Sequence, residues 1–176
     1  MEKSLKSTAI NYGIYLGLII SSITVVAYAV NLDLFTKWWY GILLLFIIII
    51  TGIISSAKAR SLSGGFISFK QAFSSYFIPI AVGVLISTTV GIVLFNVVDT
   101  EAADVIKQRS IEATVEMMEN FGSPQEAIDQ QIAVLEETDQ FSAVGQLKGI
   151  AWQLLFYSII GLIVAAIIKK KDPNLE

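Results

Sequence analysis

The chain has 176 residues, of which 55% are hydrophobic and 15% charged, with a net charge of −3 and a mean hydropathy of +0.69. Because soluble domains carry about 25% charged residues, this composition indicates a single membrane domain over residues 1–176. The chain contains no cysteine and no histidine. This excludes disulfides, zinc sites built on these residues, and Ser–His or Cys–His catalysis, so we expect neither an enzyme nor a cofactor.

Four stretches contain no charged residue, and they cover 9–30, 38–56, 71–98 and 149–168. Crossing a bilayer takes about 20 helical residues, and within lipid such segments must be helices that satisfy their own backbone hydrogen bonds. We therefore predict an all-α protein, a four-helix membrane bundle. None of the polar residues within these spans is charged. Ion-coupled carriers depend on charged residues within the membrane, so this absence argues against such a transporter.

The first stretch has a second interpretation. Lys3 and Lys6 precede the apolar run, which ends in Ala27-Tyr28-Ala29, an arrangement that resembles a signal peptide with its cleavage site. A signal peptide's apolar region is about 7–15 residues long, and this run is longer. We therefore favour a membrane span, while cleavage would leave three spans.

The loop before the third span reads KARSLSGGFISFK over residues 58–70. Ser68 followed three residues later by Gln71 predicts a capped helix start. Lys58, Arg60 and Lys70 are expected to face anionic lipid headgroups and anchor the loop. A docking site for a cytoplasmic protein is the alternative for this loop.

The segment 99–148 carries eleven acidic and three basic residues, a net charge of −8. Its first half has the pattern of an amphipathic helix that ends at Gly122. Ser123 as the cap and Pro124 in the first turn predict the start of a second helix. We expect an extramembrane helical hairpin between the third and fourth spans, with its apolar stripes buried against each other. The membrane surface and a partner chain are the alternative covers. The possible partner face is formed by Ile106, Met117, Met118 and Phe121. The acidic faces lack a calcium-loop motif, and we expect no metal site.

Small residues recur in each span at positions that share a helix face. Close approach through such residues drives association in lipid, so we assign them to packing within the bundle. A dimer seam or a small-residue-lined pathway is the alternative. The residues are Gly13, Gly17, Ser21, Gly52, Gly83, Ser87, Gly91 and Gly161.

Basic residues indicate the orientation of the spans. Eight lie in the N-terminal segment, the second connection and the C-terminus, against four in the other two connections. Because basic residues gather on the cytoplasmic side, both termini are predicted to be cytoplasmic. The predicted interface anchors are Trp38 and Trp39 outside, and Lys58, Arg60, Lys70, Lys169, Lys170 and Lys171 inside.

Four segments together resemble a known bacterial family: KSTAINYGIYLG, GGFISFKQAF, ATVEMMENFG and KKKDPN. The chain is similar over its whole length to domain of unknown function 4199, found mainly in Bacteroidota. The resemblance implies a multi-pass inner-membrane protein with four spans and an outer helical segment. It assigns no catalytic or ligand residue.

Two functions follow as hypotheses. The first is a non-enzymatic scaffold or accessory subunit that acts through helix packing and the acidic hairpin. The second is a small transporter or channel subunit for an unidentified solute. The expected partners are the lipid bilayer and either a second copy of the chain or another envelope protein, and no nucleic acid.

Overall fold

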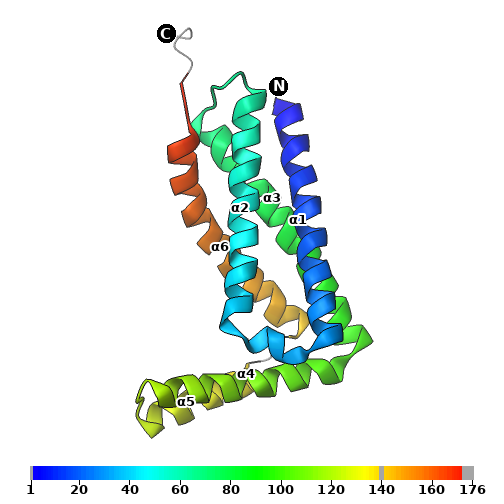
Figure 1. Cartoon of the computed structure of the whole chain (residues 1–176), viewed down its shortest axis with the longest axis vertical. Coiled ribbons are helices and arrows are strands. Elements are labelled where there is room, and N and C mark those ends of the chain that lie inside the picture. Colours follow the sequence, from blue (N-terminus) through cyan, green and yellow to red (C-terminus); the bar gives the residue numbers. More distant parts are fainter. Residues whose placement is uncertain (1, 139–140, 172–176) are drawn as a thin grey trace.

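The computed structural model describes residues 2–138 and 141–171. Four long helices form an elongated bundle (Figure 1): α1 (Glu2–Val30), α2 (Trp38–Leu62), α3 (Phe69–Val93) and α6 (Ala143–Ile168). Shorter elements lie at one end of it: a 3₁₀ turn η1 (Leu32–Thr36), a π-helical turn η2 (Leu94–Val98), and the helices α4 (Thr100–Asn120) and α5 (Gln125–Glu137). The all-α prediction is confirmed.

The four long helices are long and apolar enough to cross a membrane, over Ser4–Val30, Trp38–Leu62, Phe69–Val98 and Ala143–Ile168. They extend beyond the charge-free stretches of the sequence because a helix continues through flanking lysines and polar residues. Their outward sides carry exposed apolar residues such as Val26, Phe46 and Ile163, all more than half exposed. A soluble protein does not leave such continuous apolar surface in water, so the chain is a multi-pass membrane protein.

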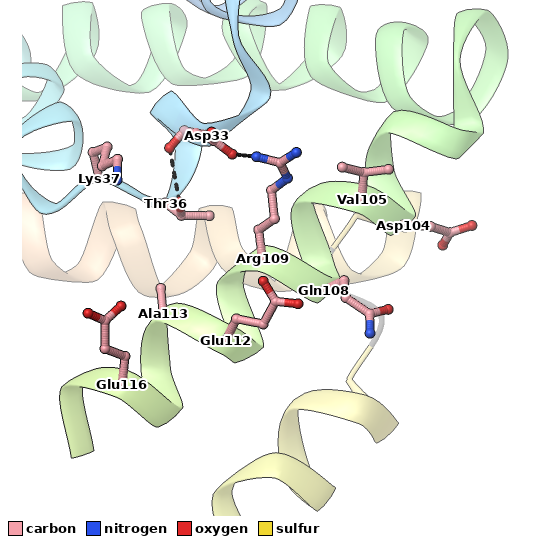
Figure 2. A pocket seen from close by; sticks show the side chains of 10 residues that line it. All are labelled: Asp33, Thr36, Lys37, Asp104, Val105, Gln108, Arg109, Glu112, Ala113 and Glu116. Carbon is pink, nitrogen blue, oxygen red and sulfur yellow. Dashed lines mark hydrogen bonds and ion pairs between the residues drawn. The ribbon is translucent and has the colours of Figure 1, made fainter. Parts of the chain in front are cut away.

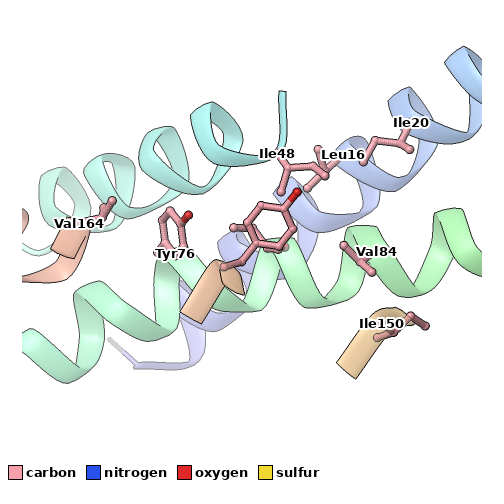
Figure 3. Close-up of a cluster of buried hydrophobic side chains, with 9 residues drawn as sticks. Leu16, Ile20, Ile48, Tyr76, Val84, Ile150 and Val164 are labelled. Atoms are coloured by element: carbon pink, nitrogen blue, oxygen red, sulfur yellow. The ribbon is translucent and has the colours of Figure 1, made fainter. Parts of the chain in front are cut away.

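Helix α3 lies at the centre of the bundle and packs against α1, α2 and α6. The main core cluster takes residues from all four helices, including Leu16, Ile48, Tyr76 and Val164. Figure 3 shows these side chains converging around α3. The bundle is therefore organised as three helices around one.

Glycines allow α1 and α3 to approach closely. A Cβ added at Gly13 would lie 2.6 Å from Val82 Cβ, and one at Gly17 would lie 2.7 Å from Ile86 Cβ. In the other direction, a Cβ at Gly83 would meet Leu16 Cδ2 at 2.7 Å. Ordinary carbon contacts are about 3.5–4.0 Å, so these positions have no room for a side chain.

Tyr76 of α3 occupies a slot between two further glycines. A Cβ at Gly52 of α2 would lie 2.7 Å from its Cε2, and one at Gly161 of α6 would lie 2.7 Å from its Cδ1. The side chain is fully buried. The ring therefore fills the space that both missing side chains leave, and it joins three helices.

Hydrogen bonds hold the loop and the helix starts together at the end of the bundle that holds the chain termini (Figure 1). Ser68 accepts from Gln71 N, and the Gln71 side chain accepts from Ser68 N, so the predicted helix start at Ser68 is confirmed. Ile67 and Lys170 exchange two backbone hydrogen bonds of 2.9 Å. The chain after α6 is thereby attached to the loop between α2 and α3.

The extramembrane hairpin is present as α4 and α5, which lie side by side across the opposite end and extend to one side of the bundle (Figure 1). We refer to α4 and α5 together as the arm. Gly122 has a φ of +70° and ends α4 as predicted, because glycine adopts this conformation without penalty. The second helix differs from the prediction. Pro124 takes the N-cap position without a side-chain cap, so Ser123 does not cap α5.

Candidate functional site

The base of the arm is an aromatic cluster formed by the end of α1, η1, η2 and the segment before α6. The ring of Phe95 lies 6.3 Å from Tyr28, 5.8 Å from Phe35 and 5.4 Å from Phe141, all in edge-to-face geometry. Ile106 of α4 packs into this cluster and is 1% exposed. Edge-to-face pairs contribute about 0.5–1.5 kcal/mol beyond the area they bury. The first turns of α4 are therefore fixed to the bundle.

Asp99 joins α1 to the start of α4. Its Oδ2 accepts from the Tyr28 hydroxyl at 2.8 Å, and its Oδ1 accepts from Ala102 N at 2.9 Å. The backbone N–H of Ala102, and then the Tyr28 hydroxyl, hold the pKa of the Asp99 carboxyl below its ordinary value of 3.8. The carboxylate is thus the helix cap of α4 and also its tether to the first span.

Two side-chain amides hold the segment that leads into α6. Asn96 Nδ2 and Gln146 Nε2 each donate to the carbonyl of Phe141 at 2.8 Å. Ser142 caps α6 by accepting from Gly145 N. The arm therefore has fixed connections at both of its ends.

A polar groove of about 610 Å³ separates η1 from the outer side of α4. Asp33 and Arg109 form an ion pair across it (Figure 2). Asp104, Glu112, Glu116 and Lys37 are among its other charged lining residues. Figure 2 shows Glu112 and Glu116 on the α4 side of the groove and Lys37 on the η1 side. Among the described residues, no group of three metal-ligating side chains is found.

The distal half of the arm is held differently from its base. Helix α5 packs on α4 with Ile128 2% exposed, and Lys107 Nζ donates to the Glu136 carbonyl at 2.7 Å. Met117 and Phe121 remain 53% and 83% exposed. The hairpin thus buries one apolar stripe internally and leaves a second apolar surface uncovered near its tip.

The predicted partner face is divided between these two regions. Ile106 is in the aromatic base, Met118 is half-buried, and Met117 and Phe121 lie toward the tip. Ile106 and Phe121 are fifteen residues apart, about 22 Å along a helix. Within the predicted partner face, the exposed part is therefore at the tip.

The predicted packing residues lie mainly on helix contacts. Gly13, Gly17, Gly52, Gly83 and Gly161 face neighbouring helices as described above. Ser21 is buried, and the hydroxyl of Ser87 donates to the Val84 carbonyl within its own helix. A Cβ at Gly91 would lie 3.1 Å from Gln146 Oε1, so this glycine faces the start of α6.

The predicted interface anchors lie at the two ends of the bundle. Trp38 and Trp39 are exposed at the start of α2. Lys169 Nζ lies 5.8 Å from the Phe69 ring centre, and Lys170 Nζ lies 5.4 Å from that of Phe66. Arg60 Nε donates to the Gly65 carbonyl at 3.0 Å. The remaining lysines, Lys58, Lys70 and Lys171, are exposed.

Sequence reasoning did not identify the residues that hold the arm. Asp99 directly before Thr100-Glu101 is a helix-cap signal that could have been found. Tyr28, Asp33 and Arg109 gave no local signal, because their partners lie far away in the sequence. These positions become recognisable only when the helices are placed in space.

Comparison with known proteins gives a family and no more. No curated protein and no solved structure matches the chain. The family model described as "Protein of unknown function (DUF4199)" matches residues 11–170, which confirms the resemblance carried by the four sequence segments. With its four apolar helices and its extramembrane helical hairpin, the chain belongs to the DUF4199 family.

Proposed function

We propose that the protein is a non-enzymatic scaffold or accessory subunit of the bacterial inner membrane that binds another envelope protein through the tip of the arm. The observation that carries this proposal is the contrast within α4. Its base is clamped by Ile106 and Asp99, whereas Met117 and Phe121 are exposed at the far end. An aromatic side chain on an exposed apolar patch is a typical anchor for a protein contact.

Charge limits the kind of partner. The segment 99–148 has a net charge of −8, and Glu116 and Glu119 flank the exposed Met117 and are themselves exposed. The complementary surface has an apolar centre that receives Phe121 and a basic rim. Such charge complementarity steers association and weakens with salt.

The proposed orientation places both termini in the cytoplasm and the arm outside. Eight of the twelve basic residues belong to the segments at the terminal end of the bundle, which supports this orientation. A reporter that fluoresces only in the cytoplasm is expected to be active after Glu176. An alkaline phosphatase fusion at the same position is expected to be inactive, and activity there would reverse the assignment.

The transporter alternative has weaker support. The glycine positions that suggested a pathway are occupied by side chains of neighbouring helices, such as Tyr76 between Gly52 and Gly161. Flux of a solute across liposomes that contain this protein alone would favour transport over scaffolding.

A photo-crosslinking amino acid at Phe121 tests the scaffold proposal in native membranes. We expect one discrete crosslinked product that disappears at high salt, and no product from the matched position Gln130, which is exposed on α5. Phe121→Glu should abolish co-purification of the crosslinked protein, whereas Gln130→Glu, with the same added charge, should retain it. Equal crosslinking from both positions would contradict a specific contact at the tip.

A further inference from the structure

A second cavity, of about 260 Å³, lies between α1 and α3 at the end of the bundle that holds the termini. It is separate from the arm and from the groove beside η1. Its lining comes from two helices only: Leu5, Lys6, Ala9, Lys70, Gln71, Ser74, Ser75 and Ile78. Two of these side chains are cationic and none is acidic.

The polar groups at its mouth are free to bind a ligand. Lys6 and Lys70 are exposed, and neither has a carboxylate partner among the side chains that the structure describes. The Oε1 atom of Gln71 accepts from Ser68 in the capping box. This fixes the amide and leaves its Nε2 donor without a partner in the described part of the chain. Two lysines and one amide-bearing side chain therefore line the same cavity.

The cavity changes from polar to apolar along α3. Lys70 and Ile78 are eight residues apart, about 12 Å along a helix. Ser74 lies between them, and Ala9 and Leu5 on α1 are buried. Lys6 and Lys70 stand at the start of two membrane-crossing helices, the depth of lipid headgroups, and Ile78 lies at the depth of acyl chains.

We propose that this cavity binds the phosphate group of an anionic membrane phospholipid, with its acyl chain along Ile78. Basic pockets between membrane helices recognise acidic headgroups through the phosphate charge. Lys6, Lys70 and the Gln71 amide hold the phosphate oxygens. The hydroxyl of Ser74 lies at the level of the glycerol and ester oxygens.

The test uses the full-length protein, delipidated in a neutral detergent, with binding followed by native mass spectrometry and by titration. Phosphatidylglycerol is expected to bind as a saturable single molecule and phosphatidylcholine, whose headgroup is neutral overall, much more weakly. The double substitution Lys6→Gln/Lys70→Gln should raise the Kd for phosphatidylglycerol about 30-fold. This corresponds to about 1 kcal/mol for each cation near the membrane surface.

The matched control is Lys58→Gln/Lys171→Gln, which removes the same charge from exposed positions outside the cavity. It should leave the Kd within about twofold, and an equal loss in both double variants would overturn the proposal in favour of general surface charge. Ser74→Leu, which fills the cavity without changing charge, should also displace the lipid. Glycerol 3-phosphate and inorganic phosphate are tested as soluble ligands that contain the phosphate without the acyl chains. Binding of either as tightly as phosphatidylglycerol would assign the site to a free phosphate and overturn the lipid assignment.

Discussion

The slot around Tyr76 predicts that two alanine substitutions on the same helix differ in their effect on stability. Gly41 and Gly52 both lie in α2. A Cβ at Gly41 has no atom within 4 Å, whereas one at Gly52 would lie 2.7 Å from Tyr76 Cε2 and 3.0 Å from Ile80 Cδ1. The two substitutions therefore share the same gain in helix propensity and differ in steric overlap.

The magnitudes follow from that difference. Gly→Ala in a helix stabilises by about 1 kcal/mol, and Gly41→Ala should show this gain. At Gly52 the overlap is about 0.8 Å below an ordinary carbon contact. The ring of Tyr76 cannot retreat from it, because Gly161 packs on its other face. Overpacking costs about 1–3 kcal/mol, so Gly52→Ala should be less stable than Gly41→Ala by that amount.

The assay is reversible unfolding in mixed micelles, followed by circular dichroism as the denaturing detergent increases. A second background sharpens the measurement. In Tyr76→Leu the overlap with the ring is removed and only the 3.0 Å approach to Ile80 Cδ1 remains, so the difference between Gly52→Ala and Gly41→Ala should become much smaller. If both alanine variants change the free energy of unfolding equally in the natural background, the ring does not fill the slot and the packing argument is wrong.

Three further predictions concern the arm and the start of α3. Because the pKa of Asp99 is lowered, its stabilisation of the arm should be complete above about pH 3.8 and lost as the pH falls through the lowered value. The rate of proteolysis of the arm should increase as the pH falls below about 3.8, and Asp99→Asn should remove this pH dependence. Both side chains of the Asp33–Arg109 pair are about 40% exposed. A double-mutant cycle with Asp33→Asn and Arg109→Gln should therefore give a coupling free energy below about 1 kcal/mol that salt abolishes. A larger coupling that resists salt would contradict this. Ser68→Ala should lower the free energy of unfolding by about 1 kcal/mol through loss of the cap, with exposed Ser61→Ala as its control, and an equal effect of the two would disprove the cap.

Local patterns in the sequence were sufficient for the spans, the hairpin, the cap at Ser68 and the stop at Gly122. Each of these depends on residues within one or two helical turns. A helical projection of the arm considers only the direction of each residue around α4. It could not determine how far along the helix the bundle covers that direction, and so Ile106 and Phe121 were placed on one surface.

The contacts that position the arm depend on residues that are distant in the sequence. Tyr28 and Asp99 are 71 residues apart, and Asn96 and Phe141 are 45 apart. The bridge between Ile67 and Lys170 likewise joins two segments of the chain that no local pattern relates. Single residues at such positions look like ordinary polar or aromatic residues until the packing of α3 against the other helices brings them together.

The π-helical turn at Leu94–Val98 affects the direction in which the arm leaves the bundle. Its hydrogen bond from Asp99 N to the Leu94 carbonyl, 2.9 Å long, spans five residues where an α-helix spans four, so the turn accommodates one extra residue. If the same five residues were wound as a regular α-helix instead, everything downstream would rotate by about 100° around the axis of α3. Asp99 would then point away from Tyr28. The direction in which the arm leaves the bundle is therefore set by the π-helical winding of Leu94–Val98 and not by the amino acids of the arm itself.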